Sequence, residues 1–223
     1  MTPANLARRV AALAQVRCAD VAVPVLSPED DHHLRRVLRA RGGEEVVVTD
    51  GAGAWAICAV EPAGLVRLTD VARDPAPAPT TLYLALVRGE RGEWAVAKAT
   101  EVGVARVVPL RSAHAQVPGG ALPKLLARWR AAASAAAGQC RRTHDLVVAD
   151  ALAVGDVPDH VAVGPEGGWS PEEWGAGRRR VSLGPTVLRA ETAAVVAGAL
   201  VSFVAGGWGF RAAQAVGKDE ASR

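Results

Sequence analysis

The sequence contains very little lysine: only three of its 26 basic residues are Lys, so arginine carries nearly all of the positive charge. Two explanations stay open. GC-rich coding favours Arg over Lys, and the planar, forked guanidinium also suits contacts to phosphates and bases. The net charge is only +3, and residues 1–74 hold nine basic against ten acidic side chains. Any attraction of that segment to nucleic acid must therefore be local.

Cysteines and long apolar runs are also scarce. Cys18, Cys58 and Cys140 lie far apart and form no CxxC pair or Cys/His cluster, which argues against a disulfide framework and a zinc site. No apolar run is long enough to span a membrane, and the first residues lack the pattern of a secretory signal. Half of the residues are hydrophobic, which is ample for a core. We expect a globular, cytoplasmic protein with no resident metal and no membrane association.

A proline-rich stretch divides the chain. Residues 75–79, PAPAP, cannot continue a helix or a sheet ladder and favour an extended linker. Residues 1–74 contain one predicted helix, with Ser27 as its N-cap, Asp30 as the partner in a capping box, and Gly42 and Gly43 at its end. Turn residues separate the strands of a small, mostly antiparallel sheet. These predicted strands are Val46–Thr49, Ala54–Val60 and Leu65–Val71.

After the linker, strands and helices alternate, which predicts an α/β domain over residues 80–210. Thr81–Val87 is apolar throughout, as expected for a parallel strand buried on both faces. The tail, residues 211–223, is predicted to be flexible. The further predicted strands are Ala105–Leu110, Leu146–Val148, Val161–Val163 and Val181–Leu183, and the helices are Glu93–Val102, Pro123–Ala137, one opened by Ser170, and Glu191–Ala205.

Two glycine-bearing loops follow predicted strands of this domain. GPEGG, residues 164–168, comes directly after a buried strand, and LGPTVLRAET, residues 183–192, leads into the last helix. Ligands of open parallel sheets bind at the carboxyl ends of strands, where glycine lets the backbone approach closely. A plain strand-to-helix turn explains GPEGG equally well. Neither loop has the spacing of a dinucleotide fingerprint or a phosphate loop, so an oxidoreductase with a nucleotide cofactor has no support.

Together, these two loops make the sequence recognisable. GPEGG followed by LGPTVLRAETA closely resembles the RsmE family of 16S ribosomal RNA (uracil-N3) methyltransferases. HHLRRVLR, residues 32–39, and KATEVGV, residues 98–104, are similar to further motifs of that family. The resemblance implies a SPOUT-type parallel sheet with a C-terminal trefoil knot, preceded by a small PUA-like β-barrel that binds RNA. It also implies a homodimer that acts on 16S ribosomal RNA in the small ribosomal subunit.

The resemblance implies S-adenosylmethionine as the methyl donor, and it assigns the candidate residues. Arg189 is the candidate for stabilising the uracil anion, because a fixed guanidinium beside developing charge stabilises it in a dry site. Glu166 is the candidate for orienting a ligand or removing the N3 proton. The predicted cofactor residues are Gly164, Pro165, Glu166, Gly167, Gly168, Leu183, Gly184, Val187, Leu188 and Arg189. The predicted RNA-binding residues are His32, Arg35, Arg36, Arg39 and Arg142.

The sequence departs from the family pattern at two places. Gly138 stands where similar sequences usually have Glu, and residues 112–114, Ser-Ala-His, replace the commoner Ser-Glu-Arg. Two other functions stay open: a methyltransferase of the same class that acts on another RNA, and a non-catalytic RNA-binding or ribosome-assembly protein. The basic helix around residues 32–39 is also consistent with a merely solvated face.

Overall fold

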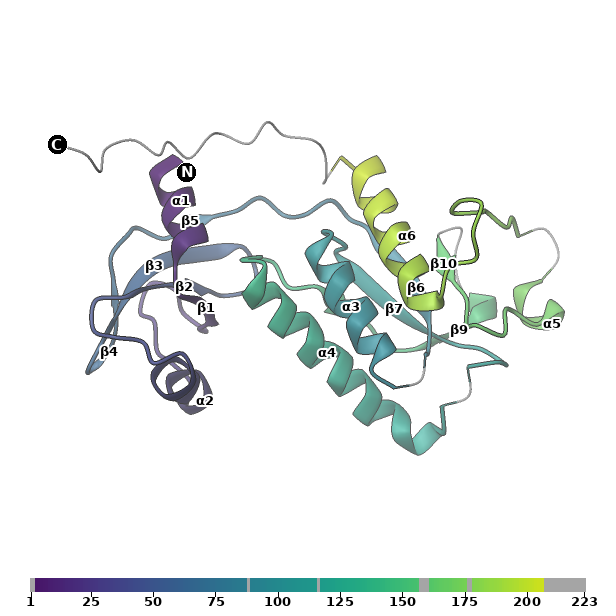
Figure 1. Cartoon of the computed structure of the whole chain (residues 1–223), viewed down its shortest axis with the longest axis horizontal. Coiled ribbons are helices and arrows are strands. Elements are labelled where there is room, and N and C mark those ends of the chain that lie inside the picture. The colour runs from purple at the N-terminus through teal and green to yellow at the C-terminus, as the bar shows by residue number, and fades with distance from the viewer. Residues whose placement is uncertain (1–2, 88, 116, 157–160, 176–177, 207–223) are drawn as a thin grey trace.

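The computed structural model describes residues 3–87, 89–115, 117–156, 161–175 and 178–206. The predicted flexible tail lies outside these residues. The chain forms two sheets that follow each other in the sequence (Figure 1). Strands β1 to β5 form the first, and β6 to β10 form the second.

The first sheet has the strand order β1-β2-β3-β4, and β5 pairs with β3. The predicted antiparallel hairpins are confirmed, since β2, β3, β4 and β5 pair in that sense. The additional edge strand β1 pairs with β2 in parallel, which the sequence did not predict. The strands span Ala14–Arg17 (β1), Glu45–Thr49 (β2), Ala54–Glu61 (β3), Gly64–Arg67 (β4) and Ala72–Arg73 (β5).

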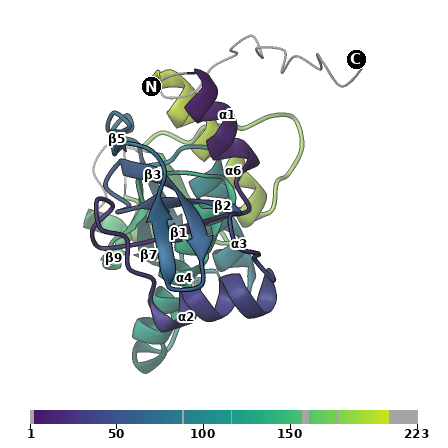
Figure 2. The same ribbon diagram turned by 90° about the vertical axis from the view of Figure 1, so that its left-hand side faces the viewer.

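Two helices lie on opposite sides of this sheet, α1 (Pro3–Ala11) and α2 (Pro28–His32) (Figures 1 and 2). The predicted N-cap of α2 is confirmed, because the Ser27 hydroxyl accepts the Asp30 N–H at 3.0 Å. The predicted end at Gly42 was wrong. A π-helical turn, His33–Val37, follows α2, and the chain leaves it at Arg39, whose φ of 56° is left-handed.

The second sheet is parallel throughout, as predicted, with the order β10-β6-β7-β8 and β9 beside β7. Side chains of the central strand β6 alternate between two apolar layers: Leu82 and Leu84 face one, and Tyr83 faces the other. Coverage of both faces explains the unbroken apolar run in the sequence. The strands span Thr81–Ala85 (β6), Arg106–Arg111 (β7), Val147–Val148 (β8), Leu152–Ala153 (β9) and Ala162–Val163 (β10).

Helix α3 lies between α4 and α6 and contacts both (Figure 1). The helices span Arg91–Glu101 (α3), Leu122–Gln139 (α4), Pro171–Trp174 (α5) and Ala190–Val204 (α6). The predicted helices are therefore confirmed, within a few residues at their ends. The predicted strand Val181–Leu183 was wrong: these residues form no strand, and Val181 is 76% exposed. Two apolar residues in alternation form too short a segment to become a strand when no neighbouring strand is there to pair with it.

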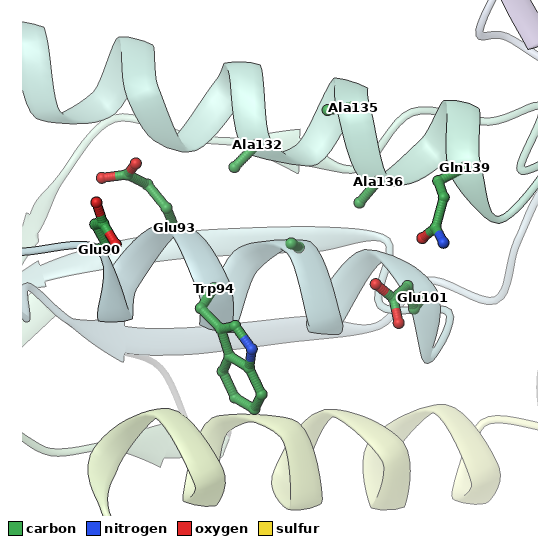
Figure 3. A pocket seen from close by; sticks show the side chains of 9 residues that line it. Glu90, Glu93, Trp94, Glu101, Ala132, Ala135, Ala136 and Gln139 are labelled. Atoms are coloured by element: carbon green, nitrogen blue, oxygen red, sulfur yellow. The ribbon is translucent and has the colours of Figure 1, made fainter.

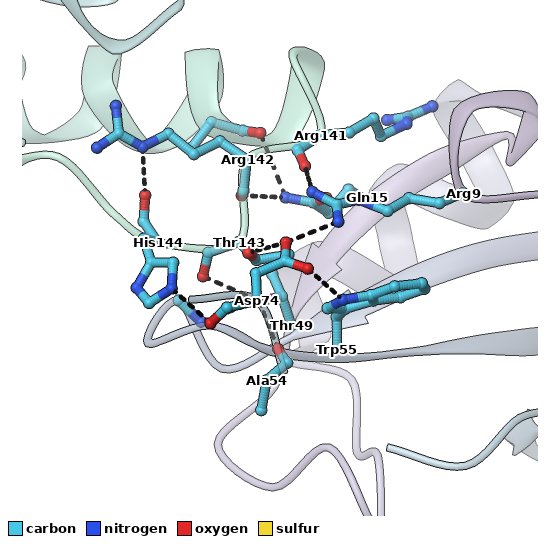
Figure 4. Close-up of polar contacts among 12 residues, drawn as sticks. Arg9, Gln15, Thr49, Ala54, Trp55, Asp74, Arg141, Arg142, Thr143 and His144 are labelled. Carbon is cyan, nitrogen blue, oxygen red and sulfur yellow. Dashed lines mark hydrogen bonds and ion pairs between the residues drawn. The ribbon is translucent and has the colours of Figure 1, made fainter. Parts of the chain in front are cut away.

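A polar cluster joins the first sheet and its linker to the loop after α4 (Figure 4). Asp74 is at its centre and accepts hydrogen bonds from Arg9 (2.7 Å), Trp55 (3.0 Å) and Thr143 (2.7 Å). Burial alone would raise the pKa of Asp74, but the hydrogen bonds from Thr143, Arg9 and Trp55 and the charge of Arg9 outweigh it and lower the pKa. The carboxylate therefore stabilises the contact in its charged form.

Further bonds of this cluster run from the first sheet to the end of α4 and the residues after it. The Gln15 amide donates to the carbonyls of Arg142 (2.7 Å) and Ala137 (3.2 Å), and Arg9 also donates to the carbonyl of Arg141. The two sheets are thereby held in one fixed arrangement.

Candidate active site

The GPEGG loop leaves β10 at the carboxyl edge of the parallel sheet. Gly164 is needed there, because a Cβ at this position would lie 3.0 Å from the Trp169 ring. The loop turns back through a hydrogen bond from the Gly168 N–H to the Pro165 carbonyl (2.9 Å), and Gly168 has a φ of +71°. Ser170 then caps α5 in a reciprocal capping box with Glu173. The predicted strand, glycine loop and capped helix are all present.

Chain segments that follow β6 and β7 contact the loop and the helix after it. Glu166 forms an ion pair with Arg91, the first residue of α3 after β6. In the turn after β7, His114 Nδ1 lies 3.0 Å from the Gly168 carbonyl, and the Ala113 N–H donates to Glu173 (2.7 Å). Chain segments after β6, β7 and β10 thus converge at one edge, where parallel sheets bind ligands.

The second predicted loop leads into α6, and α6 contacts β10, the strand that precedes the first loop. Leu183 and Trp169 pack against the same core cluster that contains Ala190, the first residue of α6. Val187 is fully exposed, and Gly184 has a φ of +138°. Arg189 is the N-cap residue of α6; its side chain is exposed and has no polar partner in the described part of the chain. The guanidinium is therefore free to meet a substrate.

Glu191 was not predicted as a site residue, although it lies in the recognised motif. The residue is only 9% exposed, and its Oε2 has no hydrogen-bond partner among the described residues. An unpartnered buried carboxylate oxygen is costly. It lies in the first turn of α6 and is suited to accept a hydrogen bond from a ligand's hydroxyl or ammonium group.

A separate groove of about 490 Å³ runs between α3 and α4 (Figure 3). Its lining includes Glu90, Glu93, Glu101 and three alanines of α4, and Trp94 extends toward α6. None of the predicted cofactor or RNA-binding residues lines it.

In the described residues, no group of three or more His, Cys, Asp or Glu side chains could hold a metal ion. Of the helices described, none is long and apolar enough to cross a membrane.

The predicted RNA-binding residues fall into two groups. His32, Arg36 and Arg39 are exposed, and no described residue forms an ion pair with them. Arg35, by contrast, bonds to Asp31 (2.6 Å) and to the Glu61 carbonyl (2.8 Å), so it holds the helix against β3.

Arg142 is also engaged within the protein. It donates to the carbonyls of Thr100 (2.9 Å) and His144 (2.5 Å), and burial lowers its pKa, although the charges of Cys140 and Asp145 oppose this. RNA binding by Arg142 stays a prediction; the described structure places two of its guanidinium nitrogens in hydrogen bonds within the protein.

Comparison with known proteins decides the family. Residues 74–161 and 157–202 match the RNA methyltransferase domain, and residues 26–66 match the RNA methyltransferase PUA domain. A protein from Mycobacterium bovis named ribosomal RNA small subunit methyltransferase E is 34% identical over 84% of this chain and 88% of its own length. The chain belongs to the RsmE family of RNA methyltransferases. An equally named protein of Synechocystis is 29% identical over 74% of this chain and 68% of its own.

Solved structures share the fold of this chain. A Legionella pneumophila methyltransferase with bound S-adenosylmethionine has a TM-score of 0.73 and 26% identity, and the match covers 85% of this chain and 97% of that one. The Neisseria gonorrhoeae ribosomal RNA small subunit methyltransferase E has a TM-score of 0.71 at 22% identity, covering 86% and 97%. The predicted α/β fold with a parallel sheet and a PUA-like domain is thereby confirmed.

Proposed function

We propose that this chain transfers a methyl group from S-adenosylmethionine to N3 of a uridine in 16S ribosomal RNA of the small ribosomal subunit. One observation carries the proposal: GPEGG follows β10 at the carboxyl edge of a parallel sheet, and α6, which Arg189 begins, contacts β10, in a chain of the RsmE family. The names of the relatives support ribosomal RNA as the substrate, and the resemblance to the RsmE family supports uracil as the methylated base.

The chain's residues fit such a donor. S-adenosylmethionine supplies an activated methyl group on a sulfonium, and it carries an ammonium group and ribose hydroxyls. The unpartnered Glu191 oxygen can accept a hydrogen bond from one of these. Backbone groups of residues 164–168 and 183–188 would hold the remainder, with Val187 and Leu188 as an apolar wall.

Chemistry at uracil N3 requires loss of a proton, because the neutral ring has no nucleophilic lone pair there. The resulting anion spreads over the ring oxygens, and the free guanidinium of Arg189 would stabilise it. The aligned encounter of nucleophile and methyl group supplies the remaining rate enhancement. We assign RNA binding in the N-terminal unit, residues 1–74, to the exposed His32, Arg36 and Arg39.

The remaining features implied by the RsmE resemblance belong to the same proposal. Residues 75–79 would act as the linker and residues 80–210 as the methyltransferase unit, with a C-terminal trefoil knot. The homodimer is supported by exposed apolar side chains along α6: Leu200, Phe203 and Val204. Groups of exposed apolar residues mark contact surfaces between proteins.

The test uses labelled S-adenosylmethionine and small ribosomal subunits that lack the modification. After incubation with the protein, the RNA is digested and the labelled nucleoside is identified. We expect N3-methyluridine from a single position. Label on another base, or only on transfer RNA, would overturn the proposal. Calorimetry with S-adenosylmethionine separates the non-catalytic alternative, for which no binding is expected.

A further inference from the structure

The turn after β7 places a histidine against the GPEGG loop. His114 Nδ1 lies 3.0 Å from the Gly168 carbonyl oxygen. A Cβ on Gly167 would lie 3.0 Å from the His114 Cβ, so the backbone and this side chain are in close contact. The turn is closed by the Ser112–Ala115 bridge and tied to α5 through the bond from the Ala113 N–H to Glu173. The backbone and Cβ of His114 are therefore held in place.

This contact sets the tautomer of the neutral imidazole. A carbonyl oxygen can only accept a hydrogen bond, so Nδ1 must carry the hydrogen. Nε2 then presents a lone pair. The residue is exposed, and no described residue bonds to Nε2. The loop thus orients an accessible basic nitrogen at the edge of the proposed cofactor site.

Glu166, the residue that the sequence suggested for proton removal, is differently engaged. Its carboxylate forms an ion pair with Arg91 and holds the GPEGG loop to the start of α3. An oxygen occupied by a guanidinium is poorly placed to take a proton from a substrate. Glu166 is better explained as the residue that fixes the loop.

We propose that His114 Nε2 accepts the N3 proton of the target uracil, an inference that rests on the proposed function. As the N–H bond breaks, its electron pair forms the bond from N3 to the methyl carbon. The bond from sulfur to that carbon breaks, and its electrons stay on sulfur, which becomes a neutral thioether. The positive charge of the sulfonium is thereby replaced by the positive charge of the imidazolium.

The surroundings contain charges of both signs. The GPEGG loop carries Glu166 with its partner Arg91, α5 carries Glu172 and Glu173, and Arg111 ends β7 just before the turn. A protonated imidazole has no lone pair with which to accept the N3 proton, so the rate of methyl transfer should fall at acidic pH.

His114→Asn provides the sharpest test, because its amide can keep the bond to the Gly168 carbonyl but has no basic nitrogen. We expect kcat to fall roughly 10²-fold or more, the acid limb of the pH profile to vanish, and the affinity for S-adenosylmethionine to stay unchanged by calorimetry. The variant should regain rate at alkaline pH, where hydroxide removes the N3 proton. His114→Ala should be partly rescued by added imidazole.

The two proposals fail in different ways. If the wild-type protein does not form N3-methyluridine on small subunits, the proposed function fails. If it does, and His114→Asn keeps both its rate and its acid limb, only the proposal for His114 is overturned. A loss of cofactor affinity in His114→Asn also overturns it, because His114 would then act by holding the loop.

Discussion

Arg189 occupies a position where its side chain can be removed without disturbing the helix that it begins. Its carbonyl accepts the Ala193 N–H at 2.8 Å, and its guanidinium has no described polar partner. We expect Arg189→Ala to lower kcat roughly 10²–10³-fold, as for loss of a group that stabilises developing charge, with an unchanged melting temperature. The assay is methyl transfer to small subunits.

The matched control is Arg106→Ala, a likewise exposed arginine at the amino end of β7, away from the loops. It should retain full turnover. Near-normal turnover of Arg189→Ala would remove Arg189 from the mechanism.

Individual site residues differ in how well the sequence predicts them. Gly164 and Gly168 could be predicted, because a close approach and a left-handed turn both require glycine, and the neighbouring sequence shows a strand before them and a helix cap after them. His114 and Arg91 could not, because they reach the loop from 54 and 75 residues away. The burial of Glu191 likewise depends on packing that local patterns do not encode.

At the scale of helices, Gly92 sets how closely α3 approaches α4. A Cβ there would lie 2.6 Å from the buried Trp129 ring. We expect Gly92→Ala to lower the free energy of unfolding by about 1–3 kcal/mol through overpacking, measured by urea denaturation.

Gly138→Ala is the control on the facing helix. Its Cβ would meet only the Gln15 carbonyl at an ordinary 3.5 Å, so the better helix propensity of Ala should stabilise it by roughly 0.5–1 kcal/mol. Equal effects of the two substitutions would contradict this account of the helix contact.

The α2 region makes a prediction about RNA. Replacing both Arg36 and Arg39 with Ala should weaken binding to 16S ribosomal RNA, and the slope of log affinity against log salt should decrease by about one for each phosphate that the variant no longer binds. Arg67→Ala, an exposed arginine on β4, serves as control. An unchanged slope in the double variant would show that this surface does not meet the RNA.

Helices and strands whose sequences show a clear hydrophobic period or capping residues could be predicted. Elements that depend on contacts with residues far away in the sequence could not. The helix α1 was missed because Leu6 and Val10 are exposed, and ion pairs from Arg8 to Glu45 and from Arg9 to Asp74 hold it in place. The strand β1 exists only because β2 lies beside it. The error at 181–183 has the same origin, since among the described residues no strand lies beside them.

For the whole molecule, Asp74 links the first sheet to the segment after α4. The pKa of its carboxyl is lowered in the folded protein, so its contribution is fully present above the unfolded value of about 3.9 and is lost as pH falls through the folded value. We expect Asp74→Asn to cost about 1–3 kcal/mol of unfolding free energy at neutral pH, and less at pH ~3.

Urea denaturation at both pH values measures this difference. Asp70→Asn is the control, because Asp70 is fully exposed and its nearest basic group, on Arg67, is 4.0 Å away. A cost for Asp74→Asn that does not change with pH would contradict the assigned role of the charge.

The proposed dimer leads to a prediction for α6. Phe203 is 52% exposed near the end of the helix, and Phe203→Glu would place a charge among apolar side chains at the contact. We expect monomers by analytical ultracentrifugation and a large loss of methyl transfer. Val23→Glu, also exposed but in the N-terminal unit, should remain dimeric. If the Phe203→Glu protein remained a dimer, the interface would have to lie elsewhere on the molecule.

The polar cluster around Asp74 also bears on the order of folding during synthesis. Gln15 and Arg9 are made long before the residues whose carbonyls they bind, which are Ala137, Arg141 and Arg142 at sequence separations of 122 to 132 residues. A nascent chain that stops before α4 is complete cannot form these bonds. We expect the segment that contains Arg9 and Gln15 to reach its final packing only after translation has passed residue 142, because contacts between distant residues form late.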